Sequence, residues 1–347
     1  MRGRARWSAG AVVGLVLAGL GPPALAEATA PVPAPALAEA SATAEAAPGR
    51  SAARYVAMGD SYSSGLGTFV YDPQTTTADN QCRRSPLAYG PLLSYADPRL
   101  RPLRFVACSG ATTSDFLTAN SDQAGEPAQL AALRRTTRTV SLTVGGNDLG
   151  FAGVAGACVQ SSQTTGFGCS RSPALNAVVA ARLAALAGAG QAPAPDGSAI
   201  VAIARLLADI GERAPRAEIF LAGYPELFGD DRADYRADPT APSQASCLVN
   251  PLVNARVDYA DAQWFNQATQ QLNGVLRAAV ERAEDAGVEA TYVSAGTFDG
   301  HGLCDQGTAW IQPVLLGSGG QPLPESLHPT AQGQVSGYAR AFRRAGI

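Results

Sequence analysis

The stretch YVAMGDSYSSG, residues 55–65, passes from an apolar segment directly into glycine, aspartate and serine. These three residue types are common in turns, so an ordinary surface loop would explain them. A second interpretation is that the apolar part is a buried strand and that Ser61 is a nucleophile held where this strand ends. The rest of the chain distinguishes the two, because such a strand needs neighbours of the same kind.

Four further apolar runs have the character of strands, and helical patterns lie between them. Together with residues 55–58, these runs cover residues 103–108, 139–145, 217–223 and 289–295. They are apolar on both faces, which is typical of strands covered by helices on each side. Alternating strands and helices predict a three-layer α/β/α sandwich around a five-stranded parallel sheet.

Helices are predicted in residues 127–135, 174–190 and 262–286 and from Pro329 onward. In the third of these, apolar residues recur at spacings of three and four, and a glycine follows as a C-cap. These positions are Phe265, Ala268, Leu272, Leu276, Ala279 and Ala283, followed by Gly287. In the last helix, Val335, Tyr338 and Phe342 are expected on one face.

Small polar residues come directly after three of the predicted strands. They are Gly59-Asp60-Ser61, Ser109-Gly110 and Gly145-Gly146-Asn147-Asp148. In parallel sheets, ligands bind outside the carboxyl ends of the strands. We therefore expect these three turns to converge on one site.

A serine hydroxyl is a weak nucleophile and needs an adjacent base, typically an imidazole, to accept its proton. The chain has two histidines. His328 follows the last strand and can reach back over the sheet, so it is the predicted base, whereas His301 is expected to orient its own loop or to line the substrate cleft. For an oxyanion, we expect donors from the backbone of Ser61 and Gly110 and from the amide of Asn147. The missing Cβ of Gly110 is expected to permit close approach.

The N-terminal part differs in composition from the rest. Residues 1–26 combine a basic start, a short apolar run and an Ala-Leu-Ala exit, which describes a secretory signal peptide. Residues 27–52, rich in Ala, Pro, Glu, Ser and Thr, are predicted to be a disordered linker, so that residues 53–347 form one catalytic domain.

Cleavage after Ala26 would remove three arginines and no acid, moving the formal net charge from −3 to −6. This balance argues against nucleic acid as a partner, and no later apolar run is long enough for a membrane anchor.

Six cysteines remain after the predicted cleavage site, namely Cys82, Cys108, Cys158, Cys169, Cys247 and Cys304. An exported chain with an even number of cysteines usually oxidises them in pairs. Six cysteines permit 15 pairings, of which pairing between neighbours in the sequence is the simplest. A zinc site is the alternative, but no C-x-x-C or H-E-x-x-H spacing exists, so no metal is expected.

Four sequence blocks, GDSYSSG, SGATT, GGND and ESLHPT, resemble in order the four blocks of the SGNH hydrolases, also called GDSL esterases and lipases. Ser61, Gly110, Asn147 and His328 occupy the positions that give this family its name. One short motif would be weak evidence, but four ordered blocks are specific. The resemblance covers roughly residues 54–343. Within the family, the chain is similar to a secreted actinobacterial lipase branch that has three disulfides. It implies a flavodoxin-like fold, a serine hydrolase activity and no cofactor.

The chain departs from this family pattern at two positions. The usual leucine after the nucleophile is Tyr62, which is expected to affect packing. The usual aspartate three residues before the histidine is Glu325, which is one methylene longer. Either Glu325 or a backbone carbonyl of the same loop, as in some members of the branch, could orient His328.

Several residues near the predicted site admit two interpretations. Asp60 and Asp148 are expected to be turn and capping groups rather than catalytic acids. Four aromatic residues belong either to the core or to the wall of an acyl pocket, namely Tyr62, Phe69, Phe151 and Trp310.

Together these observations predict a secreted, monomeric hydrolase of acyl or lipid esters that forms an acyl-enzyme on Ser61. One alternative is a polysaccharide O-deacetylase of the same fold. Another is a non-catalytic binding module that retains the fold, although an intact set of nucleophile, base and oxyanion donors argues against it.

Overall fold

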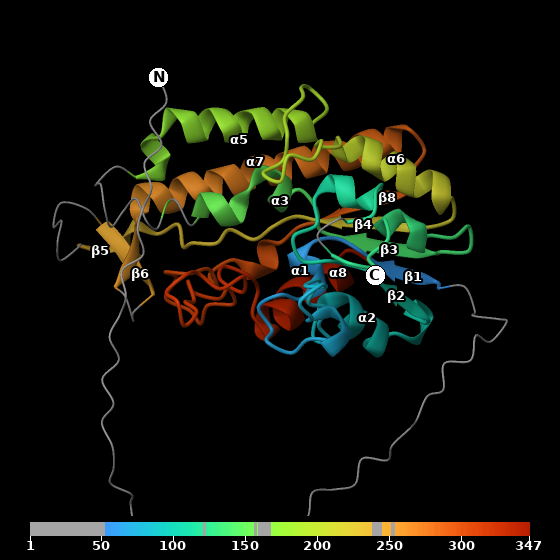
Figure 1. The fold of residues 1–347 in the computed structure, drawn as a ribbon, viewed down its shortest axis with the longest axis horizontal. Coiled ribbons are helices and arrows are strands. Elements are labelled where there is room, and N and C mark those ends of the chain that lie inside the picture. Colours follow the sequence, from blue (N-terminus) through green and yellow to red (C-terminus); the bar gives the residue numbers. More distant parts are fainter. Residues whose placement is uncertain (1–52, 121–122, 156–157, 159–167, 238–244, 251–253) are drawn as a thin grey trace, which may run out of the picture. The chain divides into compact units, whose positions relative to one another are not determined.

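The computed structural model describes residues 53–120, 123–155, 158, 168–237, 245–250 and 254–347. The predicted signal peptide and linker, residues 1–52, lie outside the described residues. Within the described part, the fold is built on one parallel sheet with helices on both faces (Figure 1).

The parallel sheet has five strands, and each forms within one of the apolar runs identified in the sequence. They are β1 (Tyr55–Ala57), β2 (Leu103–Phe105), β3 (Thr139–Leu142), β4 (Glu218–Ala222) and β8 (Ala290–Val293). Their order in the sheet is β2-β1-β3-β4-β8, with every pair parallel. This order is the flavodoxin-like one, so the predicted fold class is confirmed.

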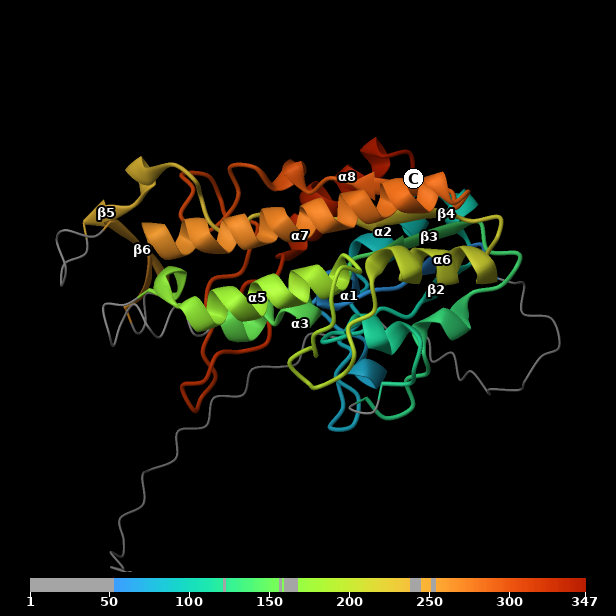
Figure 2. The same cartoon turned by 90° about the horizontal axis from the view of Figure 1, so that it is seen from above.

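Helices cover the two faces of this sheet and complete the three layers (Figures 1 and 2). On one side lie α5 (Pro173–Leu186), α6 (Ile203–Arg213) and α7 (Tyr259–Asp285), with α7 packed against both α5 and α6. On the other side, α2 (Tyr89–Ala96) packs against the C-terminal helix, whose last part is α8 (Arg340–Arg344). Because helices exclude water from both faces, the central strands are almost wholly buried.

The predicted helix in residues 262–286 is α7, which begins three residues earlier. Asp258 caps its start by accepting a hydrogen bond from the backbone N–H of Asp261 at 2.8 Å, and Gly287 follows its end with φ +81°. The six predicted apolar positions, from Phe265 to Ala283, are all buried. The helix predicted in residues 174–190 is likewise confirmed as α5, which Ser172 caps.

The prediction of a helix in residues 127–135 is wrong, because only a 3₁₀ turn, Gln129–Ala132, forms there. The side chain of Gln129 is buried and bonds both backbone groups of Gly59, at 2.7 and 2.9 Å. Leu130, within this turn, and Leu133, directly after it, are buried as well. Tertiary contacts therefore override the local helix propensity of this segment.

The C-terminal helix begins after Thr330 and contains a π-helical segment, Gly333–Ala339, before α8. Tyr338 and Phe342 are buried as predicted, but Val335 is 43% exposed. The prediction for Val335 is wrong because it assumed the period of a regular α-helix, and π-helical turns are wider.

A second, three-stranded antiparallel sheet was not predicted. It consists of β5 (Arg236–Ala237), β6 (Ala245–Asn250) and β7 (Ala255–Asp258), in the order β5-β6-β7. Among the described residues, short helical segments also include α1 (Ser61–Ser64) and α3 (Gly146–Leu149), with 3₁₀ turns at Pro73–Thr75, Pro98–Leu100, Thr113–Phe116, Cys169–Arg171, Arg232–Asp234 and Gly296–Phe298.

Three disulfides join residues that are neighbours among the cysteines of the chain. They are Cys82–Cys108, Cys158–Cys169 and Cys247–Cys304. Of the 15 possible pairings, the structure therefore has the one that neighbour pairing predicts. Cys247–Cys304 connects the small antiparallel sheet to the loop after β8.

Candidate active site

Ser61 is the first residue of α1, in the turn that follows β1. Asp60 caps this helix by accepting from the backbone N–H of Tyr62 at 3.0 Å. Gly59 precedes it with φ +124°, a conformation that glycine adopts without the strain of a side chain. A Cβ on Gly59 would also collide with Ser63 and with the Thr143 carbonyl. The Gly59-Asp60-Ser61 stretch is thus a tight turn that places a largely buried serine at the carboxyl end of the sheet.

Two buried aspartates support this turn and its neighbour. Asp60 accepts from the Thr143 hydroxyl at 2.6 Å and from the hydroxyl of Tyr224. Asp148 accepts from the hydroxyl of Thr113 at 2.6 Å and from its backbone N–H at 3.1 Å. Burial raises the pKa of each aspartate to about 6. Both carboxyl groups are occupied by structural hydrogen bonds, as the capping interpretation predicts.

His328 is in direct contact with Ser61. Its Nε2 lies 2.8 Å from the Ser61 Oγ, and its Nδ1 lies 2.9 Å from the backbone carbonyl of Ser326. A carbonyl can only accept, so Nδ1 carries the proton and Nε2 is free to accept from the serine hydroxyl. Burial, together with the charge of Arg83, lowers the pKa of His328 to about 4. The imidazole is therefore neutral at pH 7 and can act as a base.

Glu325 does not contact the imidazole with its carboxylate. Its Oε1 instead forms an ion pair with Arg83 Nη1 at 2.8 Å and accepts from the Tyr71 hydroxyl at 3.4 Å. The side chains of Arg83 and Glu325 are only 19% and 9% exposed. Of the two alternatives for orienting His328, the structure therefore has the backbone carbonyl, because the turn before His328 directs the Ser326 carbonyl, and not the Glu325 carboxylate, at Nδ1.

The predicted oxyanion donors lie in turns that follow three neighbouring strands of the sheet, β1, β2 and β3. Gly110 has φ +85°, and the backbone N–H groups of Ser61 and Gly110 have no hydrogen-bond partner within the described part of the chain. Asn147, in α3, donates one side-chain N–H to the Ala111 carbonyl at 2.9 Å, which leaves a second N–H. A Cβ on Gly110 would meet open space, so its positive φ, and not close approach, explains the glycine.

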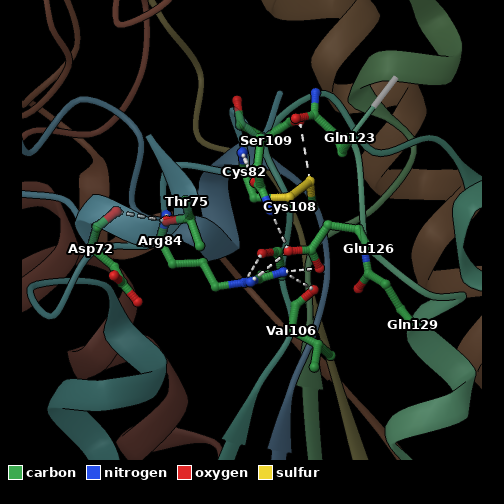
Figure 3. A network of polar contacts seen from close by, with 12 residues as sticks. Asp72, Thr75, Cys82, Arg84, Val106, Cys108, Ser109, Gln123, Glu126 and Gln129 are labelled. Carbon is green, nitrogen blue, oxygen red and sulfur yellow. Dashed lines mark hydrogen bonds and ion pairs between the residues drawn. A yellow bond between two sulfur atoms is a disulfide. The ribbon is translucent and has the colours of Figure 1, made fainter. Parts of the chain in front are cut away.

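The loop that carries Gly110 is anchored by residues that the sequence did not single out (Figure 3). The side chain of Arg84 donates to the Ala107 carbonyl at 2.8 Å and forms an ion pair with Glu126. The disulfide Cys82–Cys108 ties the segment of Cys82 to this loop, and the Cys82 carbonyl accepts from the Ser109 N–H at 3.0 Å. In the sequence, the only signal for this anchor is the pair of arginines, Arg83 and Arg84, after Cys82, and this pair does not identify Ala107 or Glu126 as partners.

An apolar cavity of about 490 Å³ opens beside Ser61 and His328. Its wall is formed by aromatic and aliphatic side chains, among them Tyr62, Phe151, Tyr224, Leu227, Phe265, Val314, Leu316 and Leu323. This volume and lining are typical of small-molecule sites. Of the four aromatic candidates, Tyr62 and Phe151 thus line the cavity.

The other two aromatic candidates lie elsewhere. Phe69 is 53% exposed at the surface. Trp310 stacks on His301 with ring centroids 3.5 Å apart, and His301 Nδ1 bonds the Thr308 carbonyl at 2.9 Å. His301 therefore orients its own loop, one of the two roles expected for it.

A serine–histidine contact beside an apolar cavity, at the carboxyl edge of a flavodoxin-like sheet, is an arrangement that suits a serine hydrolase. The sequence profile of the GDSL-like lipase/acylhydrolase family matches residues 57–335. The chain belongs to this family and is a carboxylic ester hydrolase.

Relatives of known activity agree with this assignment. A lipase from Streptomyces rimosus is 32% identical over 302 residues, which is 87% of this chain and 90% of the relative. Lipase 1 from Streptomyces coelicolor is 32% identical over 295 residues, 85% of this chain and 87% of the relative. Among solved structures, phospholipase A1 from Streptomyces albidoflavus NA297 matches with a TM-score of 0.59 at 30% identity, covering 84% of this chain and 98% of that protein.

Two features of the described residues bear on partners. No group of three or more His, Cys, Asp or Glu side chains could hold a metal ion there. In the same ranges, no helix combines the length and the apolar character needed to cross a bilayer.

Proposed function

We propose that the protein hydrolyses acyl esters with a catalytic dyad of Ser61 and His328. The observation that carries the proposal is that the imidazole of His328 contacts the Ser61 Oγ through Nε2 and the Ser326 carbonyl through Nδ1, with both distances shorter than 3 Å. In such a dyad, the carbonyl fixes the tautomer that a third, acidic residue fixes in a triad.

The reaction proceeds in two displacements. Ser61 Oγ attacks the ester carbonyl while His328 Nε2 accepts the hydroxyl proton, and the resulting oxyanion accepts hydrogen bonds from the backbone of Ser61 and Gly110 and from Asn147. The imidazolium then protonates the leaving alcohol, and the carbonyl re-forms as an acyl-enzyme. Water then attacks the acyl-enzyme in the same way, with His328 as its base, and the carboxylic acid is released.

The acyl group of the substrate is proposed to occupy the apolar cavity. Its lining carries few polar groups beyond those at Ser61 and His328, which suits an extended hydrocarbon chain better than an acetyl group. The names of the relatives, lipase and phospholipase A1, point in the same direction. Lipid esters are therefore the proposed substrates, ahead of acetylated polysaccharide.

The proposed site of action is outside the cell. Support comes from the N-terminal signal-peptide pattern in residues 1–26 and from three disulfides, which form and persist in oxidising environments. Residues 53–347 are proposed to act as one catalytic domain after removal of this leader.

A series of p-nitrophenyl esters of rising acyl length tests the proposal. Hydrolysis should increase from the acetyl to the medium-chain esters, and Ser61→Ala should lower kcat by about 10⁴-fold or more while circular dichroism stays unchanged. A fluorophosphonate should label the wild type at Ser61 and leave the alanine variant unlabelled. An active Ser61→Ala variant would refute the dyad, and a preference for acetyl esters would refute the lipid substrate.

A further inference from the structure

Tyr62 stands where the family usually has leucine, directly after the proposed nucleophile. Its hydroxyl donates to the Leu327 carbonyl at 2.9 Å, across 265 residues of sequence. Its ring also contacts the imidazole of His328, with centroids 5.1 Å apart. Burial raises the pKa of the Tyr62 phenol, so the hydroxyl keeps its proton and acts as the donor.

The acceptor of this bond belongs to a strained turn. Leu327 has φ +62°, a left-handed conformation that a branched aliphatic residue rarely adopts and that costs free energy. The turn lies between Ser326, whose carbonyl accepts from His328 Nδ1, and His328 itself. Strain of this kind persists only where surrounding contacts hold it.

Two contacts hold the peptide groups on either side of Leu327. The Leu327 N–H donates to the Gln312 carbonyl at 3.0 Å. In a trans peptide the N–H and the preceding carbonyl point in opposite directions, so this bond aims the Ser326 carbonyl away from Gln312 and at the imidazole. Tyr62 holds the next peptide group through the Leu327 carbonyl. Rotation of the turn to an unstrained conformation would break both bonds.

Tyr62 is itself fixed at both backbone ends. Its N–H donates to the buried carboxyl of Asp60 at 3.0 Å, and its carbonyl accepts from the side chain of Gln334 at 3.0 Å. Gln334 is fully buried in the C-terminal helix, six residues after His328. The hydroxyl of Tyr62 therefore reaches Leu327 from a rigid base that also carries Ser61.

We propose that Tyr62 is a positioning residue that holds the strained Leu327 turn, so that the Ser326 carbonyl fixes the proton of His328 on Nδ1. The inference rests on the proposed Ser61–His328 dyad and explains how that dyad keeps one tautomer without an acid. The same side chain sets the spacing between nucleophile and base, because one residue is bonded to both segments.

Tyr62→Phe removes the hydroxyl and keeps the ring. The loss of one neutral hydrogen bond corresponds to about a tenfold change, and we expect it in kcat with KM nearly unchanged, because the substrate wall is preserved. The matched control is Tyr89→Phe, which removes a buried hydroxyl bonded to Ser63 of the same short helix at 2.7 Å. This control should keep the wild-type kcat.

A spectroscopic readout separates positioning from a general loss of structure. The chain has two histidines, so the imidazole nitrogens are readily assigned by NMR with isotope-labelled histidine. Wild type should show His328 as the Nδ1–H tautomer, whereas Tyr62→Phe should show a mixture of tautomers. His301, whose Nδ1 bonds Thr308, serves as internal reference and should not change.

Leu327→Gly provides a second variant, because glycine adopts positive φ without the strain. In this background, Tyr62→Phe should lower kcat by less than it does in the wild type. An unchanged tautomer and kcat in Tyr62→Phe, or strictly additive effects in the double variant, would overturn the inference. The tautomer is measured without turnover, so a failure of the proposed esterase function, seen as an active Ser61→Ala variant, is distinguishable from a failure of this inference.

Discussion

The turn that carries Ser61 and the turn that carries His328 are held in different ways. In the first, local bonds set the shape of the turn, since Asp60 accepts from the N–H groups of Tyr62 and Ser64 and Gly65 donates to the Ser61 carbonyl. Side chains from distant segments, such as Thr143, then bind the Asp60 carboxyl of the turn so formed. In the second, the main partners come from elsewhere in the chain, as when Tyr62 bonds Leu327 or Arg83 pairs with Glu325 across 242 residues.

This contrast explains why one turn is a recognisable motif and the other is not. A turn stabilised by its own residues requires a short, fixed set of residue types, here GDSYSSG. A turn stabilised from outside can vary in sequence as long as its partners compensate. The departures from the family pattern at Tyr62 and Glu325 both concern the second turn.

The largest effect is expected from His328→Ala. The base is lost, and no other imidazole lies beside Ser61, so kcat should fall by about 10⁴–10⁶-fold. His301→Ala is the control, because His301 bonds only its own loop and Trp310 among the described residues. Comparable losses in the two histidine variants, measured with one p-nitrophenyl ester, would contradict the assignment of the base.

Asn147→Ala should produce the next largest loss. Removal of one oxyanion donor lowers kcat by about 10²–10³-fold elsewhere, and the change in KM should be smaller. Part of the effect would reflect the bond from Asn147 to the Ala111 carbonyl, which ties the two oxyanion turns together. A change confined to KM would mean that Asn147 binds substrate without stabilising the oxyanion.

Glu325→Ala should be much milder than either change. Its carboxylate pairs with Arg83 and not with His328, so kcat should stay within about 10–100-fold of wild type, well short of the roughly 10⁴-fold loss that follows from a neutralised triad aspartate. Arg83 would be left partly buried without its partner, so the melting temperature should also fall. A loss of activity as large as that of His328→Ala would make Glu325 an essential acid.

The pH dependence of kcat/KM gives a finer test of the base. The pKa of His328 is lowered to about 4, so the base is neutral above that value and protonated below it. We expect kcat/KM to stay level as the pH falls from about 7 to 5 and to decline below about 4. An acid limb near the ordinary histidine pKa of about 6.5 would contradict this expectation.

The smallest expected effect is the shift of this acid limb in Arg83→Gln. The cation helps to hold the pKa of His328 down, and its removal also leaves the Glu325 carboxylate unneutralised. Both changes favour the imidazolium, so the limb should move to higher pH while kcat/KM near pH 8 changes little. Arg99→Gln, at an exposed arginine, is the control and should leave the profile unchanged.

The sequence by itself determined the parts of this protein that depend on neighbouring residues. Five apolar runs marked the strands of the parallel sheet, period-three-and-four spacing marked α7, and the cysteine order matched the disulfides. Three of the four family blocks directly follow strands, and parallel strands place their carboxyl ends together. The placement of Ser61, Gly110 and Asn147 in turns at one edge of the sheet was therefore predictable from local patterns alone.

Only the tertiary structure decided what orients His328, why residues 127–135 form a 3₁₀ turn and not a helix, and how Arg84 anchors the oxyanion loop. Each depends on a hydrogen bond or ion pair between segments distant in sequence, for which no periodicity exists. The Ser326 carbonyl belongs to the backbone, which every residue has, so no residue type announces its role. Its direction follows from the φ of Leu327 and from bonds to Gln312 and Tyr62, and these arise only when the folded chain brings those groups together.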